Sequence, residues 1–157
     1  MTYTTHSESD TLAFASRLAP MLAPGDTVLL TGDLGAGKSV LARGIARGMG
    51  VTGAMPSPTF TLMIPYEEGG RRLYHFDLYR LSDPDEYYAA GLDEFVGGDG
   101  VALIEWPQMA ELEPSPALRI ALARADVDDA RRITIENDGV AGFDPAALAD
   151  WRDADDL

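Results

Sequence analysis

Gly32-Asp-Leu-Gly-Ala-Gly-Lys38-Ser39 is a complete GxxxxGK[ST] pattern, the sequence signature of a P-loop. The glycines allow the backbone to turn so that successive N–H groups face phosphate oxygens, and the start of the following helix adds partial positive charge. Lys38 is the only lysine of the chain, and the other eleven basic residues are arginines. A compact ammonium on a flexible stem reaches the β- and γ-phosphates, where a planar guanidinium fits less well. The motif predicts a nucleotide phosphate site.

The segments on either side of this loop have the order that a P-loop requires. Residues 27–31 form a short β-branched and apolar run after the turn signal at 24–26, which predicts a strand buried on both faces. Residues 39–49 carry apolar side chains at helical spacing, and Gly48 and Gly50 end the pattern. Strand, glycine-rich loop and helix therefore follow one another.

The composition is that of one folded domain, because 157 residues with 46% hydrophobic content supply a single core. No apolar run approaches the roughly 18 residues of a membrane-spanning helix, and the polar N-terminus is unlike a signal peptide. The chain has no cysteine and only two histidines, which argues against disulfides and a histidine-rich metal site. We expect a cytoplasmic protein without a membrane partner.

The net charge of −14 argues against nucleic-acid binding by the chain's own surface, since phosphate contacts need clustered cations.

The negative charge is concentrated near the end of the chain. From Asp126 onward ten acidic residues stand against three arginines, which favours a solvated and partly disordered tail over a partner-binding device. We expect a single P-loop ATPase domain over residues 1–143 and an acidic C-terminal helix or tail over residues 144–157.

The remaining patterns predict a mixed domain, beginning with a helix capped by Asp10. Further along, we expect a hairpin of strands 59–64 and 72–79 around a turn at 67–70, a helix from Asp83-Pro84 to Gly91, a buried strand at 101–104, a hairpin of 118–123 with 131–136, and a short helix at 144–151. The predicted fold is α/β: a single P-loop NTPase-like domain whose mixed sheet has a parallel centre, antiparallel hairpins and helices on both faces.

Two acids are candidates for the Mg²⁺ site. A P-loop protein that hydrolyses ATP holds Mg²⁺ with the loop hydroxyl, here Ser39, and with an acid at the end of a buried strand. Glu105 directly follows the apolar run 101–104, which best matches a strand beside the P-loop strand, so we prefer it as the metal ligand. Asp77 lies in an alternating and therefore less central run, and we place it nearby as a water-positioning or coupling group. For both acids, an ordinary solvated strand end is the alternative.

Four further side chains have a functional and a structural interpretation. Ser57 and Thr59 reach the γ-phosphate or its water if their segment folds over the site, and turn chemistry around two prolines is the alternative. Trp106 is either a core aromatic or a contact beside the site. We expect His75 to be packed or hydrogen-bonded within its strand rather than catalytic.

The candidate site residues form two sets. The residues expected to bind the nucleotide are Gly32, Asp33, Leu34, Gly35, Ala36, Gly37, Lys38, Ser39, Val40, Ser57 and Thr59. The catalytic candidates are Lys38, Asp77, Glu105 and Trp106, with Ser39 and Glu105 as metal ligands. Among the arginines, Arg80, Arg131 and Arg132 are candidates for a phosphate or partner contact, and the sequence does not single out one of the three.

Four stretches of the chain resemble the TsaE (YjeE) family, a bacterial P-loop ATPase of the machinery that makes N6-threonylcarbamoyladenosine next to the tRNA anticodon. They are residues 32–39, Ser57-Pro-Thr-Phe-Thr-Leu62, Tyr74-His-Phe-Asp-Leu-Tyr-Arg-Leu81 and Glu105-Trp-Pro107, in the family's order between residues 27 and 137. Many families share the P-loop, whereas the tyrosine-to-leucine stretch together with Glu-Trp-Pro is far more specific.

The resemblance implies an ATP-binding and ATP-hydrolysing accessory subunit rather than the transferase itself. In such a protein Lys38 would bind phosphate, and Ser39 and Glu105 would hold Mg²⁺. Asp77 would serve hydrolysis. Ser39 stands where the family more often has threonine, which keeps the hydroxyl and loses only a methyl group.

The resemblance also implies a switch and partners. The stretch that begins at Ser57 would sense the nucleotide, and Trp106 would sit beside the site and matter for activity. The implied partners are TsaD, which carries the transfer site, and TsaB. The substrate tRNA would be reached only through them, which agrees with the acidic composition.

Other classes of P-loop protein remain as alternatives. A small-molecule or nucleotide kinase would need an acceptor pocket and usually an arginine-rich lid, and the sequence has no such arginine cluster. A GTP switch would be expected to carry an Asn/Thr-Lys-x-Asp element, which cannot exist here because Lys38 is the sole lysine. An ATP-responsive binding module without turnover is the third possibility.

Overall fold

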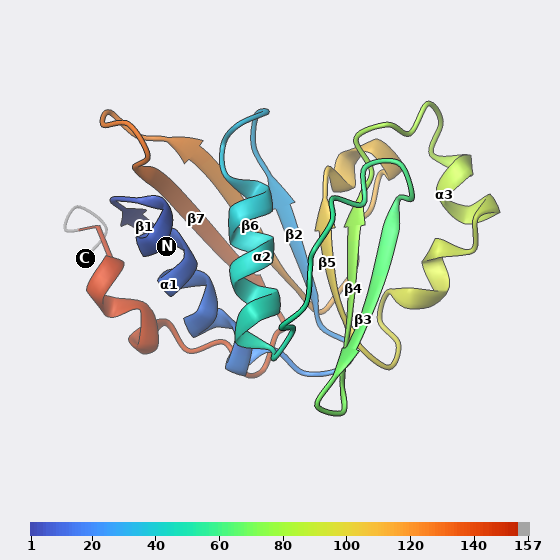
Figure 1. Ribbon diagram of the computed structural model, residues 1–157, viewed down its shortest axis with the longest axis horizontal. Helices are drawn as coiled ribbons and strands as arrows, with labels where there is room; N and C mark the ends of the chain where they lie inside the picture. Colours follow the sequence, from blue (N-terminus) through green and yellow to red (C-terminus); the bar gives the residue numbers. More distant parts are fainter. Residues whose placement is uncertain (154–157) are drawn as a thin grey trace.

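The computed structural model describes residues 1–153, and a mixed β-sheet lies at its centre (Figure 1). Within these residues the sheet has seven strands in the order β1-β7-β6-β2-β5-β4-β3. β2 pairs in parallel with β5 and β6, and β4 pairs in parallel with β5, whereas β1, β3 and β7 pair antiparallel with their neighbours. The predicted fold class is confirmed. The strands are β1 (Thr2–Thr5), β2 (Thr27–Thr31), β3 (Met63–Glu68), β4 (Arg71–Asp77), β5 (Val101–Glu105), β6 (Ala117–Arg124) and β7 (Arg131–Asp138).

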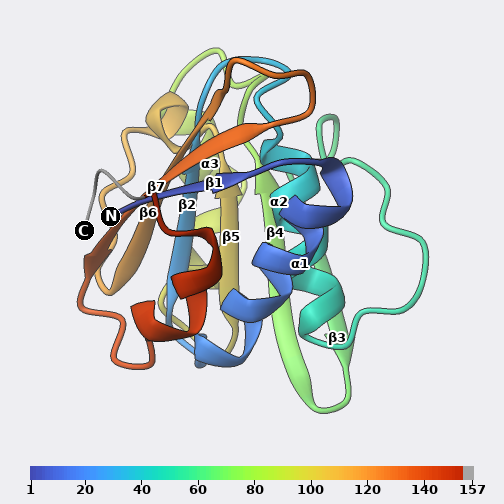
Figure 2. The same ribbon diagram turned by 90° about the vertical axis from the view of Figure 1, so that its left-hand side faces the viewer.

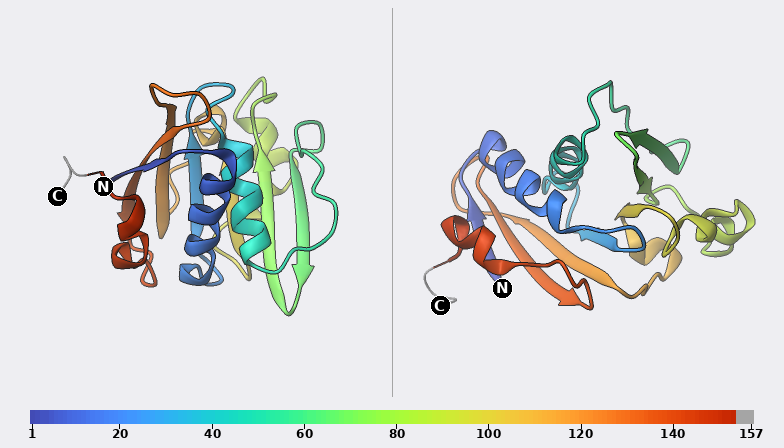
Figure 3. Two further views of the ribbon diagram at one scale, coloured as in Figure 1. Left: turned by 60° about the vertical axis from the view of Figure 1, so that its left-hand side comes forward. Right: turned by 90° about the horizontal axis from the view of Figure 1, so that it is seen from below.

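Helices cover both faces of the sheet. α1 (Glu8–Leu18) and α2 (Lys38–Gly48) lie side by side on one face (Figures 1 and 2). They approach closely because α2 has a glycine where they touch: a Cβ at Gly44 would lie 2.5 Å from the Cβ of Ala15. The opposite face is covered in part by α3 (Asp85–Ala89) and by the 3-10 helices η2 (Leu92–Phe95) and η3 (Pro107–Ala110) (Figure 3). Two further 3-10 helices, η1 (Ala19–Met21) and η4 (Pro145–Trp151), follow α1 and β7.

The first helix begins earlier than the sequence suggested. Ser7, not Asp10, is the N-cap of α1, and its side chain accepts a hydrogen bond from the backbone N–H of Asp10. The Asp10 carboxylate accepts instead from the N–H of His6 and from the indole of Trp151. Serine and aspartate are both favourable N-cap residues. Here the hydroxyl of Ser7 satisfies the otherwise free N–H three residues further on.

The first hairpin differs from its prediction at both ends. β3 begins at Met63 rather than at Thr59, because Leu62 has a φ of 69° and donates its N–H to the carbonyl of Pro58. Residues 59–61 therefore form a turn. β4 ends at Asp77, and its residues 73–77 are all buried instead of alternating, since β4 has a strand on each side and side chains packed on both faces. The expected order is nevertheless correct: β5 lies beside β2, and β4 lies beyond it.

The two ends of the described chain pack together. The sequence did not predict β1, which pairs with β7, and the expected solvated tail from Asp126 is wrong for the described residues. Residues 131–138 form β7, and η4 packs against α1, with the ring of Trp151 5.4 Å from that of Phe14. Residues 154–157 of the predicted tail lie outside the described residues. No helix of residues 1–153 has the length and apolarity needed to cross a bilayer.

We expect Leu148→Ala to lower the free energy of unfolding by about 2–5 kcal/mol, because Leu148 of η4 is fully buried and its truncation leaves a cavity. Urea denaturation followed by circular dichroism measures the change. Asp150→Ala, at an exposed position of the same segment, is the control and should change that free energy by less than about 0.5 kcal/mol. Equal effects of the two substitutions would contradict a core role for η4.

Candidate active site

Three parallel strands end at the same edge of the sheet and bring the predicted residues together. The P-loop leaves β2 after Thr31, and Asp77 and Glu105 are the last residues of β4 and β5. Parallel neighbours have their carboxyl ends at one edge, where α/β proteins bind ligands. The loop and both acids surround a cavity of about 490 Å³.

The loop backbone adopts conformations that favour glycine. Gly32, Gly35 and Gly37 have φ angles of 142°, 79° and 106°. A Cβ at Gly32 would lie 2.5 Å from the carbonyl oxygen of Leu122, so this position has no room for a side chain. Gly37 is the N-cap of α2, and the first turn of that helix lines the cavity. The free N–H groups and dipole of a helix start suit a phosphate at this place.

The ammonium of Lys38 is held inside the loop. Its Nζ donates hydrogen bonds to the carbonyl oxygens of Gly32 (2.5 Å) and Asp33 (2.7 Å) and lies 4.4 Å from the centre of the Trp106 ring. Desolvation by burial lowers the pKa of Lys38, and the nearby carboxylates, Glu105 foremost, act in the opposite direction. The two hydrogen bonds thus hold the ammonium within the loop, at the cavity that Lys38 lines.

Glu105 and Asp77 are register neighbours on adjacent parallel strands. Oε1 of Glu105 accepts a hydrogen bond from Oγ of Ser39 (3.0 Å), and Oε2 accepts one from Nε2 of His75 (2.7 Å). Asp77 accepts from Oγ1 of Thr59 (3.1 Å) and from the backbone N–H two residues further on (3.1 Å). The side chains are not solvated strand ends, because Glu105 is 3% exposed and Asp77 is 8% exposed.

The pair of Ser39 and Glu105 suits Mg²⁺, a hard cation that prefers oxygen ligands. Mg²⁺ usually takes one or two carboxylates and completes its shell with phosphate and water. Across residues 1–153 there is no group of three or more Asp, Glu, His or Cys side chains that could hold a metal, so a cation here would need such additional ligands. Asp77 is bonded to Thr59 rather than to Ser39, which leaves Glu105 as the acid beside the loop hydroxyl.

The segment around Thr59 lines one side of the cavity and is hydrogen-bonded to Asp77. Oγ of Ser57 and Oγ1 of Thr59 are 2.6 Å apart, and both residues line the cavity. The ring of Phe60 is 81% exposed and lies 4.4 Å from the guanidinium carbon of Arg80. Hydroxyls of this segment thus reach the edge of the site, as the functional interpretation requires.

Trp106 forms a wall of the cavity. Its backbone is left-handed, with a φ of 59°, directly after the last residue of β5. The ring packs 4.8 Å from that of Tyr79 and faces the ammonium of Lys38. The residue is partly buried, so it belongs to the edge of the core and to the site at once.

Most of the predicted residues meet in this one cavity. Those that line it are Leu34, Gly35, Gly37, Lys38, Ser39, Val40, Ser57, Thr59, Asp77, Glu105 and Trp106. The carbonyl oxygens of Gly32 and Asp33 accept hydrogen bonds from Nζ of Lys38. Asp33 and Ala36 line a separate cavity of about 390 Å³.

Three further residues line the cavity and were not among the predicted site residues: Tyr79, Arg80 and Arg131. The two arginines had been named only as possible phosphate or partner contacts. Tyr79 and Arg80 lie two and three residues after the end of β4, a position that could have signalled a role. Arg131 had no such signal. It is the first residue of β7, and only the antiparallel pairing of β7 with β6 brings it to this edge of the sheet. The Nε atom of Arg131 would lie 3.3 Å from a Cβ at Gly37.

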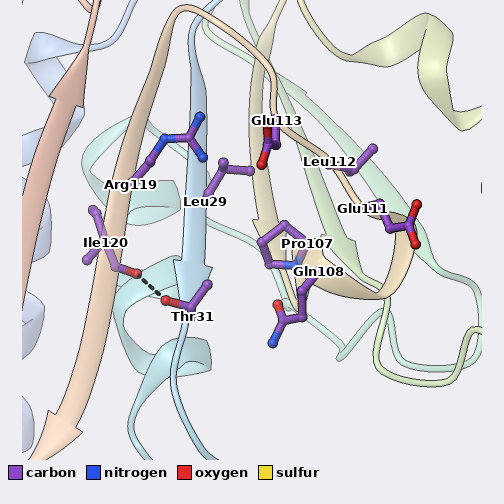
Figure 4. Close-up of a pocket in the computed structure, with 9 residues that line it drawn as sticks. All are labelled: Leu29, Thr31, Pro107, Gln108, Glu111, Leu112, Glu113, Arg119 and Ile120. Atoms are coloured by element: carbon purple, nitrogen blue, oxygen red, sulfur yellow. Dashed lines mark hydrogen bonds between the residues drawn. The ribbon is translucent and has the colours of Figure 1, made fainter. Parts of the chain in front are cut away.

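A second cavity of about 460 Å³ lies between β2, β6, η3 and the residues that follow η3 (Figure 4). Thr31 donates a hydrogen bond to the carbonyl of Ile120 there, and Arg119 and Glu113 extend toward the same space. None of the predicted site residues lines this cavity. The P-loop cavity is therefore the candidate active site.

Comparison with known proteins agrees with this geometry. The family model described as "Threonylcarbamoyl adenosine biosynthesis protein TsaE" matches residues 5–133. The chain belongs to the TsaE family. The tRNA threonylcarbamoyladenosine biosynthesis protein TsaE of Bacillus subtilis is 44% identical over 131 residues, which cover 83% of this chain and 81% of the relative. The same-named protein of Haemophilus influenzae is 39% identical over 133 residues, or 82% and 84% of the two chains.

A solved structure shares the fold of this TsaE-family chain. The crystal structure of YdiB from Bacillus subtilis superposes with a TM-score of 0.76 at 35% identity, covering 96% of this chain and 92% of YdiB. The match to the TsaE model ends within β7, so η4 lies beyond the matched residues.

In this member of the TsaE family, Gly32→Ala should reduce nucleotide affinity by about tenfold or more, because the new Cβ collides with the carbonyl of Leu122 and displaces the loop. Titration with a fluorescent ATP analogue measures the affinity. Gly53→Ala is the matched control, since a Cβ there meets no atom within 4 Å. Unchanged affinity in Gly32→Ala would contradict the assignment of the loop.

Proposed function

We propose that this chain is an ATP-binding and ATP-hydrolysing accessory subunit for the formation of N6-threonylcarbamoyladenosine in tRNAs that read codons beginning with adenosine. It acts with the TsaD–TsaB transferase complex. The observation that carries the proposal is the arrangement around one cavity of two buried charged side chains, Lys38 and Glu105, with the hydroxyl of Ser39 bonded to Glu105, in a chain of the TsaE family.

In the proposed site each residue has a distinct role. The P-loop amides and Lys38 bind the phosphates, and Ser39 and Glu105 hold Mg²⁺. When bound, Mg²⁺ neutralises charge on the phosphate oxygens. Asp77 accepts a hydrogen bond from Thr59, so we assign it to the coupling of the 57–62 segment with water at the γ-phosphate. Trp106 packs over the Lys38 ammonium and shields it from water.

We propose that contact with tRNA is indirect. A chain with a net charge of −14 lacks the clustered cations that phosphate backbones require, so TsaD and TsaB would supply that contact. We propose a cytoplasmic location; without cysteine the chain has no disulfide that would need an oxidising compartment.

Mass spectrometry of tRNA nucleosides tests the proposal in cells depleted of this protein and complemented with wild type or Lys38→Ala. We expect threonylcarbamoyladenosine to fall on depletion and to return only with wild type, because the alanine removes the charge that binds phosphate. Purified Lys38→Ala should bind ATP at least about tenfold more weakly. Unchanged modification after depletion would reject the function and favour a small P-loop kinase.

The two acids are distinguished by the cation dependence of ATP binding. Glu105→Ala should remove most of the affinity that Mg²⁺ adds and leave Mg²⁺-free binding nearly unchanged, because it deletes a metal ligand. Asp77→Ala should preserve the gain from Mg²⁺ and slow phosphate release. Isothermal titration calorimetry with Mg²⁺ or EDTA, together with a phosphate-release assay, measures both. If Asp77→Ala abolishes the Mg²⁺ gain instead, the metal assignment belongs to Asp77.

A further inference from the structure

The two oxygens of the Glu105 carboxylate have different partners. Oε1 accepts from the hydroxyl of Ser39, a residue that lines the P-loop cavity. Oε2 accepts from Nε2 of His75 at 2.7 Å, and both side chains are nearly inaccessible, at 7% and 4% exposed. A carboxylate oxygen can only accept, so the hydrogen of this bond is carried by Nε2.

The sheet fixes His75 in this position. His75 lies two residues before Asp77 on β4, and the parallel register with β5 pairs His75 with Leu103 and Asp77 with Glu105. Side chains two residues apart on a strand share a face, so His75 is diagonal to Glu105 on the same face of the sheet. Two hydrogen-bonded strands move little relative to each other, and the contact is preorganised.

We propose that His75 is a positioning residue that occupies Oε2 and leaves Glu105 a single oxygen for a cation. The inference rests on the proposed role of Glu105 as a metal ligand. Its consequence is ion selectivity: Mg²⁺ demands compact octahedral geometry, whereas Ca²⁺ readily accepts both oxygens of one carboxylate. A Glu105 with one oxygen reserved by His75 therefore favours Mg²⁺ over Ca²⁺.

This role differs from simple filling of the core. A residue that only packs would change folding stability and would affect Mg²⁺ and Ca²⁺ alike. A hydrogen-bond donor to a metal ligand sets the orientation of that ligand, and its loss typically weakens metal affinity by about 10–100-fold. The informative quantity is therefore the gain in ATP affinity from Mg²⁺ divided by the gain from Ca²⁺.

The test measures the affinity of the full-length protein for ATP by calorimetry in Mg²⁺, in Ca²⁺ and in EDTA. We expect His75→Leu to reduce the gain from Mg²⁺ by about tenfold or more and the gain from Ca²⁺ by much less, with binding in EDTA unchanged. His75→Gln is the matched variant, because its amide N–H can still donate to Oε2, and it should keep the wild-type ratio of Mg²⁺ to Ca²⁺. His75→Asn, whose shorter amide falls short of Glu105, should behave as His75→Leu and serves if the leucine variant does not fold.

The outcomes separate this inference from the proposed function. If wild-type protein binds ATP equally well with and without Mg²⁺, the proposed metal site itself is wrong. If wild type depends on Mg²⁺ but the leucine and asparagine variants keep its cation ratio, His75 does not position Glu105. An equal loss for both cations would likewise overturn the selectivity role.

Discussion

The parallel pairing of β2 with β5 determines whether the candidate active site exists. It sets Leu30 opposite Glu105, so that the strand entering the P-loop and the strand carrying the acid end together. Side chains alternate along a strand, and a slip of one residue would turn Glu105 to the face covered by α3. The register is held from both sides, because β6 flanks β2 and β4 flanks β5. Helix α2 then needs only the short glycine-rich turn to bring Ser39 within 3.0 Å of Glu105.

Three ionisable groups are buried around the cavity, and removing their charges from water lowers the folding stability of a small domain. Lys38, Asp77 and Glu105 are each less than 10% exposed. Every one of them is hydrogen-bonded, which limits the penalty of removing a charge from water. Lys38, Arg80 and Arg131 line the cavity together with the carboxylates of Asp77 and Glu105, so its charges of both signs suit a phosphate group paired with a cation. Such local conflict with stability is characteristic of functional sites.

The sequence anticipated the parts of the fold that local patterns encode. The P-loop with its strand and helix, the neighbouring strand that ends in Glu105 and the later hairpin all have distinctive composition. Contacts between distant segments were not accessible in this way: β1 has four residues and pairs with β7 some 130 positions later, and Arg131 reaches the cavity only through that hairpin. The left-handed Leu62, which delays β3, has no signal in its residue type. The bond between His75 and Glu105 depends on strand register.

The position of Lys38 has a consequence for the chemical reactivity of the whole protein. The chain has one lysine side chain, and the fold leaves 5% of it exposed within the phosphate-binding loop. A covalent mark that requires a lysine amine can therefore attach to one side chain only, and an acyl group at this amine cancels the charge that the loop presents to phosphate. Lysine acylation of this protein therefore acts on its phosphate-binding loop, and a ligand in the cavity covers the only lysine that an acyl group could reach.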